Sequence, residues 1–384
     1  MRFGRSVRSG QENRWPTNFL LHAHNAVQVM NWEELLGHQR QRHWFQRALD
    51  NGRLANSFLF VGSEGIGKRT FARLIAKSLL CRGSAADTLE FCDRCEDCAQ
   101  VEASTHPDLI EVSKPEEKSF LPLELLIGEA TNRNREGLCH ELSLKPHGGR
   151  RKIAIVDDAD YLNAEGANCL LKTLEEPPPR SLLMLIGTSV QRQLPTIRSR
   201  CQILLFQPLA AADLATLLVQ QGIVEAIDEA HMLASMSSGS LEIARGLADP
   251  ALHQFRSQLW NALGRSPLPI VQLTRRCEEI VNEAGKEARP RRDRLKLIAQ
   301  MAAEFFRAVI LLDTTNSAAA ESLVANAQLR QSVRQALAQT NLSRERALAA
   351  WQRCLAAIEQ VDRNANQSTL IESWFCDMAH ACQS

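Results

Sequence analysis

A glycine-rich loop between a short apolar run and an amphipathic segment is the feature that most constrains how this chain can fold. The run Phe58–Val61 leads directly into Gly62-Ser63-Glu64-Gly65-Ile66-Gly67-Lys68-Arg69-Thr70, and apolar residues at helical spacing follow. Glycines in this position let backbone N–H groups turn inward around phosphate oxygens at a helix start, and Lys68 adds a cation. We therefore predict a nucleotide-binding loop formed by Gly62, Gly65, Gly67, Lys68 and Thr70.

The residue after Lys68 departs from the pattern of a Mg-ATP site. That pattern places a hydroxyl directly after the lysine to coordinate Mg²⁺. This chain has Arg69 there, and the hydroxyl of Thr70 arrives one residue late. The loop shape is therefore predicted, whereas productive binding of ATP with Mg²⁺ is doubtful. The alternative is a glycine-rich turn with an exposed lysine.

Four further apolar runs predict a sheet. They are separated by longer helix-like segments and lie at Leu109–Val112, Ile153–Val156, Leu182–Ile186 and Ile203–Phe206. Continuous apolar runs suit strands that are buried on both faces, and alternation with helices indicates parallel strands. We predict an α/β fold, a parallel sheet with helices on both faces, with ligands at the carboxyl ends of the strands.

Two acids, Asp157 and Asp158, stand where the run Ile153–Val156 ends. P-loop ATPases keep an acid for magnesium at this place, and often a glutamate that positions water. The second acid here is an aspartate, which is one methylene shorter and poorly placed to align a water with a γ-phosphate. Both acids are candidates for a degenerate nucleotide site, and solvated acids that cap the next helix are the alternative.

Four of the 11 cysteines fall within 18 residues, which predicts a metal site. Cys81, Cys92, Cys95 and Cys98 supply four thiolates, a set that suits tetrahedral zinc with every position closed and hence a structural role. Free thiols or a redox site are the alternatives. The odd number of cysteines and the lack of a convincing secretory signal predict a reducing, cytoplasmic location.

Charge and hydropathy exclude several classes of protein. Lys plus Arg number 45 against 44 Asp plus Glu, so a net charge of +1 gives no global attraction to nucleic acid or acidic lipid. The longest apolar run is about six residues, far short of the roughly 20 that a spanning helix needs. We therefore predict no membrane partner.

The chain of 384 residues is long enough for two or three domains. We predict an extension or misassigned start at 1–29 with translation beginning at Met30, a nucleotide-binding-like domain at 30–206 with a zinc module at 81–98, a helical lid at 207–249, and a helical domain at 250–384. Helical patterns in the last region cover 251–263, 270–286, 293–312, 318–338, 343–362 and a final stretch to about 381. The basic run Arg289–Arg294 is predicted as an exposed loop, with contact to a phosphate backbone as the alternative.

The combination of motifs resembles the AAA+ subunits of the bacterial DNA polymerase III clamp loader. The resemblance covers about 31–248 and adds Asn168–Pro178 and Ser199-Arg200-Cys201 to the motifs above. It implies a P-loop AAA+ domain, a lid and a C-terminal collar for oligomerisation. It also implies gamma or tau and delta subunits as partners, together with the sliding clamp and, through the complex, primed DNA. Thr188 matches a nucleotide-sensing residue, and Arg200 matches an arginine finger that reaches the ATP of a neighbouring subunit; a plain surface arginine is the alternative.

Three departures from the family pattern distinguish motor from non-motor subunits. Motor subunits carry Ser or Thr where this chain has Arg69, and Glu where it has Asp158. They carry Arg where it has Glu242. A carboxylate at the third place would repel a triphosphate. The resemblance therefore implies a non-motor stator subunit of the DNA-directed DNA polymerase complex, without its own ATPase activity, that helps load the clamp during DNA replication. A gamma- or tau-like ATPase and a zinc-dependent nucleic-acid-binding module are the alternatives.

Overall fold

The structure is a computed structural model that describes residues 31–115, 117–313, 324, 326–340, 342–363 and 365–383. The predictions for 1–29 and for a start at Met30 lie outside the described residues. So does the first part of the helix predicted at 318–338.

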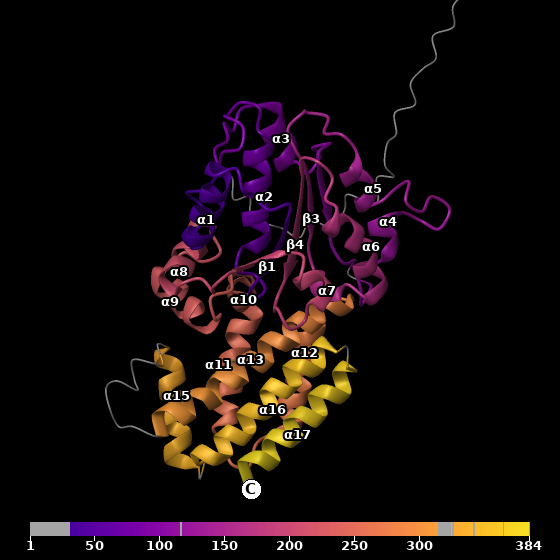
Figure 1. The fold of residues 1–384 in the computed structure, drawn as a ribbon. Coiled ribbons are helices and arrows are strands. Elements are labelled where there is room, and N and C mark those ends of the chain that lie inside the picture. The colour runs from indigo at the N-terminus through magenta and orange to yellow at the C-terminus, as the bar shows by residue number, and fades with distance from the viewer. Residues whose placement is uncertain are drawn as a thin grey trace, which may run out of the picture.

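Five parallel strands form one sheet in the order β2-β3-β4-β1-β5 (Figure 1). Their bounds are β1 Ser57–Val61, β2 Leu109–Val112, β3 Lys152–Val156, β4 Ser181–Gly187 and β5 Gln202–Leu205. Every residue of β1, β3 and β4 is buried, as expected for central strands covered on both faces. The predicted α/β class and all five predicted strands are confirmed.

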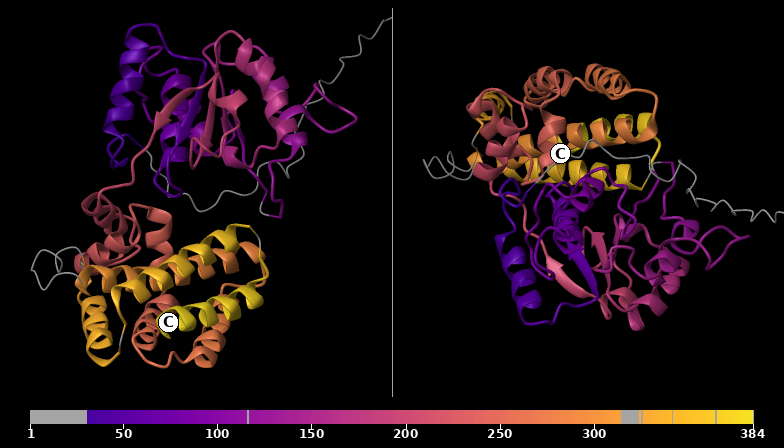
Figure 2. Two further views of the ribbon diagram at one scale, coloured as in Figure 1. Left: turned by 60° about the horizontal axis from the view of Figure 1, so that its bottom comes forward. Right: turned by 90° about the horizontal axis from the view of Figure 1, so that it is seen from above.

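Helices cover both faces of the sheet (Figures 1 and 2). Helices α1 (Gln39–Asp50) and α2 (Lys68–Leu80) lie on one face, and α4 (Leu123–Ile127), α5 (Leu138–Ser143), α6 (Ala164–Glu175) and α7 (Pro195–Arg198) on the other. The short α3 (Glu96–Glu102) follows the cysteine cluster. Side chains of β1 alternate between the two cores, since Phe58 and Phe60 pack with Phe71, and Leu59 and Val61 pack with residues of α4 and α6.

The rest of the described chain is helical. Helices α8 (Ala211–Gln220), α9 (Ile227–Met236) and α10 (Leu241–Leu247) lead into α11 (Pro250–Leu263), α12 (Ile270–Glu283), α13 (Ala288–Asp313), α15 (Ala327–Gln339), α16 (Arg344–Asp362) and α17 (Gln367–Gln383). One continuous apolar core contains buried residues from Leu209 to Ala379, so helices on both sides of the predicted boundary at 249 share this core. That boundary stays a prediction. Within the described part of the chain, no helix has the length and apolar character needed to cross a membrane.

The prediction of an exposed loop at Arg289–Arg294 is wrong, because this run forms the first turns of α13. Pro290 lies in the first turn, where a missing N–H costs nothing because such groups have no partner within the helix. Arg294 forms an ion pair with Asp249, which caps α11 by accepting a hydrogen bond from the Ala251 N–H. Arg294 thus ties the first part of α13 to the start of α11.

Candidate nucleotide site and cysteine cluster

The glycine loop lies between β1 and α2 at the carboxyl edge of the sheet. Gly65 and Gly67 adopt the left-handed conformations that favour glycine, with φ of 70° and 97°. A Cβ on Gly62 would lie 2.6 Å from the Phe206 carbonyl oxygen, so no larger residue fits there. Lys68 folds back onto the loop, since its Nζ donates to the carbonyls of Gly62 at 2.6 Å and Ser63 at 2.5 Å. Burial lowers the pKa of Lys68, although neighbouring acids, Asp157 first, act in the opposite direction.

Arg69 occupies the place where a magnesium-binding hydroxyl is usual. Its guanidinium nitrogens lie 3.6 Å from Asp157 Oδ2 and 3.8 Å from Glu111 Oε1, and Arg73 lies 3.2 Å from the other oxygen of Glu111. Burial raises the pKa of Asp157, and the Arg69 charge opposes that rise. Thr70, the late hydroxyl, is half-buried one residue further along α2. The acid that would coordinate a metal therefore already faces a cation of the same chain.

Removal of the Arg69 charge should turn this acidic pair into a cation site. Arg69→Ala is expected to lower the free energy of unfolding by about 1–2 kcal/mol, because Asp157 and Glu111 lose a partly exposed partner. We expect Mg²⁺ to raise the Tm of this variant but not that of the wild-type chain. Arg73→Ala, which leaves Arg69 in place, is the matched control. The measurement is thermal unfolding of the three chains with and without Mg²⁺. An equal change in Tm for all three would contradict the view that Arg69 occupies a potential cation site.

Asp158 begins the short 3₁₀-helix η2 (Ala159–Tyr161) in a left-handed conformation, with φ of 57°. The next helix after Tyr161 is α6, and its capping side chain is that of Asn163, which accepts a hydrogen bond from the Gly166 N–H, so the prediction that the two acids cap this helix is wrong. Burial raises the pKa of Asp158, and the charge of Asp157 adds to that effect. Charges of Arg289 and Lys114 oppose it, which places the start of α13 in the electrostatic environment of the site.

The start of helix α10, in the region predicted as a lid, contacts the glycine loop. The Leu241 N–H donates to the Gly65 carbonyl at 2.9 Å, and a Cβ on Gly65 would lie 2.4 Å from Ser240 Oγ. This contact brings Glu242 against the loop, where burial raises the pKa of its carboxyl group and the charge of Glu64 adds to the rise. Carboxylates therefore crowd the place where a triphosphate would need positive charge.

Thr188, the predicted sensing residue, follows β4 and is held by an acid that the sequence did not single out. Its N–H and its hydroxyl donate to Asp160 Oδ2 at 2.7 and 2.6 Å, and Gln193 binds the other oxygen of that carboxylate. No sequence signal identified Asp160. Glu111 was also missed, although a charge inside the apolar run Leu109–Val112 was a usable signal.

Arg200 lies at the opposite edge of the sheet from the glycine loop. It precedes β5, whose first residue Gln202 pairs with Phe58, whereas the loop begins after Val61. About 10 Å of strand therefore separates Arg200 from the loop of its own chain. The side chain is 33% exposed and forms an ion pair with Glu175. The Arg200 side chain therefore lies away from the glycine loop of its own chain.

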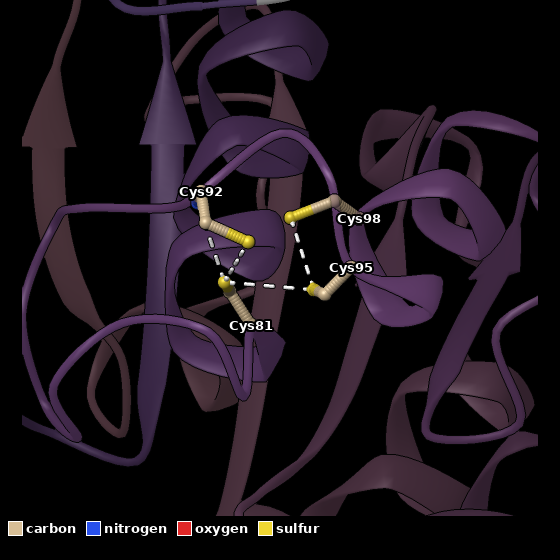
Figure 3. Close-up of side chains that lie close together, drawn as sticks. All are labelled: Cys81, Cys92, Cys95 and Cys98. Atoms are coloured by element: carbon tan, nitrogen blue, oxygen red, sulfur yellow. Dashed lines mark hydrogen bonds between the residues drawn. The ribbon is translucent and has the colours of Figure 1, made fainter.

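The four clustered cysteines point their sulfur atoms toward one another (Figure 3). All four sulfurs lie within 4.8 Å of one another, with separations of 3.6 Å for Cys81–Cys92, 3.7 Å for Cys81–Cys95 and 3.6 Å for Cys95–Cys98. Metal–sulfur bonds of about 2.3 Å in a tetrahedron give sulfur separations of about 3.8 Å. The cluster therefore fits a tetrahedral metal ion, and the separations are too long for disulfides.

Surrounding residues hold the cysteines in this arrangement. The Cys92 N–H donates to Cys81 Sγ at 3.4 Å, and a Cβ on Gly83 would lie only 2.4 Å from Cys92 Sγ. Asp97 is buried and accepts hydrogen bonds from the backbone and side chain of Arg82. The sequence did not single out Gly83, because the need for a glycine at this position comes from its contact with Cys92 across the loop.

The parallel sheet, the glycine loop after β1, the acids after β3 and the polar residue after β4 define a P-loop protein of the AAA+ class. A sequence model of the family described as DNA polymerase III, delta subunit matches residues 37–210. The delta-prime subunit of Bacillus subtilis is 32% identical over 215 residues, 56% of this chain and 60% of the relative. The delta-prime subunit of Pseudomonas aeruginosa is 35% identical over 208 residues, 53% and 59% of the two chains.

The tau subunit of Escherichia coli is also similar, with 30% identity over 232 residues that cover 57% of this chain and 32% of tau. The matches to the delta-prime relatives span about three-fifths of their lengths. Over residues 37–210 the chain is therefore similar to the family described as DNA polymerase III, delta subunit, and over about half its length to delta-prime subunits.

Proposed function

We propose that this chain is a non-motor stator subunit of the replicative clamp loader, without ATPase activity of its own. In this role it joins gamma- or tau-type and delta subunits, helps to load the sliding clamp onto primed DNA, and supplies Arg200 to the ATP site of a neighbouring subunit. The similarity to delta-prime, gamma and tau subunits supports these partners.

The observation that carries the proposal is the contrasting placement of two arginines. Arg69 faces inward and pairs with Asp157, so the acid that a catalytic metal would need is already neutralised. Arg200 is partly exposed and lies just before the edge strand β5, at the end of the strands away from the glycine loop. Arginine suits a role in trans because its planar fork can grip phosphate oxygens. This contrast supports a chain that assists hydrolysis in a neighbouring subunit and not at its own loop.

The cysteine cluster has a structural role in this proposal. Cys81, Cys92, Cys95 and Cys98 would hold zinc, which four thiolates prefer, and four protein ligands leave no position for a reacting water. The ion would tie together the ends of a loop that otherwise has a small apolar core. It takes no part in nucleotide chemistry.

ATP binding and steady-state hydrolysis with Mg²⁺, measured on the purified metal-loaded chain, test the proposal. We expect weak binding and no turnover alone, but a raised rate when a gamma- or tau-type subunit is added. Turnover by the chain alone that disappears in Lys68→Ala protein would contradict the proposal and favour a gamma-like ATPase. The matched control is Lys118→Ala, which alters a lysine outside the loop.

A further inference from the structure

Glu175 covers one edge of the guanidinium group of Arg200. The Nε of Arg200 donates to Glu175 Oε1 at 2.9 Å, and Nη2 lies 2.7 Å from the same oxygen. On the other side, Nη1 donates to the Thr196 carbonyl and to the Ser199 hydroxyl, at 3.0 Å each. All three guanidinium nitrogens therefore contact atoms of the same chain.

This arrangement competes with phosphate binding. Arginine grips a phosphate best through two parallel N–H groups, and the Nε–Nη2 edge offers such a pair. The carboxylate of Glu175 occupies that edge, and its negative charge would repel a phosphate brought beside it. Glu175 must therefore move away before Arg200 can bind phosphate along this edge.

The position of Glu175 is not explained by the stability of its own helix. It is the last residue of α6, at the negative end of the helix dipole, where an acid is mildly unfavourable. Its side chain is 51% exposed, so it fills no space in the core. Among the described residues, its carboxylate contacts Arg200, and this contact is the interaction that accounts for a glutamate here.

We infer that Glu175 is a latch: it holds Arg200 in the free chain and releases it when the phosphates of a neighbouring subunit's nucleotide arrive. The inference rests on the proposed function of Arg200. An ion pair as exposed as this one is screened by water and shifts an equilibrium by at most about fivefold. Hydrogen bonds from arginine to phosphate in a closed interface are stronger, so the nucleotide can displace the carboxylate.

The first test measures how fast phenylglyoxal, an arginine-selective reagent, modifies Arg200 in the free full-length chain. Mass spectrometry at successive times gives the modification rate. Glu175→Gln keeps the size of the side chain and removes its charge, and we expect it to speed modification about two- to fivefold. Glu176→Gln alters the adjacent exposed acid and is expected to match the wild-type rate. Equal rates for Glu175→Gln and wild-type chains would overturn the latch, whatever Arg200 does in a complex.

The second test measures ATP hydrolysis in a complex with a gamma- or tau-type subunit. We expect Glu175→Gln to lower the ATP concentration for half-maximal rate about two- to fivefold, with the maximal rate unchanged or higher. A lower maximal rate would mean that Glu175 orients Arg200 for catalysis, and an unchanged half-maximal concentration would mean that it does not restrain Arg200; either result overturns the latch. If Arg200→Ala leaves hydrolysis intact, the proposed function fails instead, and the modification rates still test the latch.

Discussion

Arg200→Ala protein is expected to enter the complex normally but to lose nearly all stimulation of the neighbouring ATP site. Arginines that reach a transferring phosphate from another subunit contribute about 10³–10⁵-fold to kcat. We expect the loss in kcat to be of this size at the neighbouring site that Arg200 would reach. The loss in the total rate should be smaller, because that rate is summed over several ATP sites. Single-turnover hydrolysis, measured in a complex in which the other ATP sites are inactivated, is the appropriate measurement.

Loss of stability should not obscure this result. The side chains of Arg200 and Glu175 are 33% and 51% exposed, and a pair so exposed contributes about 0–1 kcal/mol to the free energy of unfolding. Arg200→Lys keeps the charge but removes the planar fork, so we expect it to recover little of the rate. Arg192→Ala, at a nearby exposed arginine, is the control. Full stimulation by Arg200→Ala protein would disprove the role of this arginine in trans.

The sheet could be predicted from the sequence because its signals are local. Each apolar run is continuous, as strands buried on both faces require, and each became a strand within one or two residues of its predicted bounds. The cysteine cluster was equally accessible, since close spacing along the chain brings four side chains near one another without long-range packing. Fold class and the cluster therefore followed from residue order alone.

Contacts between distant segments explain what the sequence did not reveal. Glu242 lies against the glycine loop because Ser240 contacts Gly65, and these two residues are far apart in the chain. The partner of Thr188, Asp160, is held by a turn that no propensity predicts. The basic run that starts α13 was interpreted as a loop because its charges outnumber its apolar residues, whereas tertiary contact through Arg294 and Asp249 favours the helix.

The acids around the glycine loop also acquire their meaning from contacts between distant segments. The resemblance to clamp-loader subunits implies that Arg69, Asp158 and Glu242 replace the residues of a motor subunit, and each replacement alone would be a weak argument. The structure joins them, because Arg69 pairs with Asp157 while Glu242 and Glu64 approach the loop from the lid and from the loop itself. A loop with an arginine paired to its nearest acid and carboxylates on two sides would be unfavourable to a triphosphate.

Cys98→Ser protein is expected to lose most of its bound zinc and the order of residues 81–98. Cys98 is buried and its sulfur lies 3.6 Å from that of Cys95, so it would supply one of the four bonds of the closed site. Structural zinc sites contribute about 10–16 kcal/mol of apparent binding free energy, and most of it depends on a complete ligand set. We therefore expect about one zinc per wild-type chain by elemental analysis, and much less in the variant.

Loss of the ion should spread into the domain, because the cysteine loop packs against it. The Trp32 indole donates to the Leu89 carbonyl at 2.8 Å, and the buried Lys77 pairs with Asp93 in the same loop. Without zinc these contacts have no fixed partner, so we expect a lower Tm and rapid proteolysis within 81–98. Cys376→Ser, at an exposed cysteine outside the cluster, should change neither zinc content nor Tm. A wild-type chain that resists chelators and carries no zinc would show that the four thiols hold this loop together without a metal.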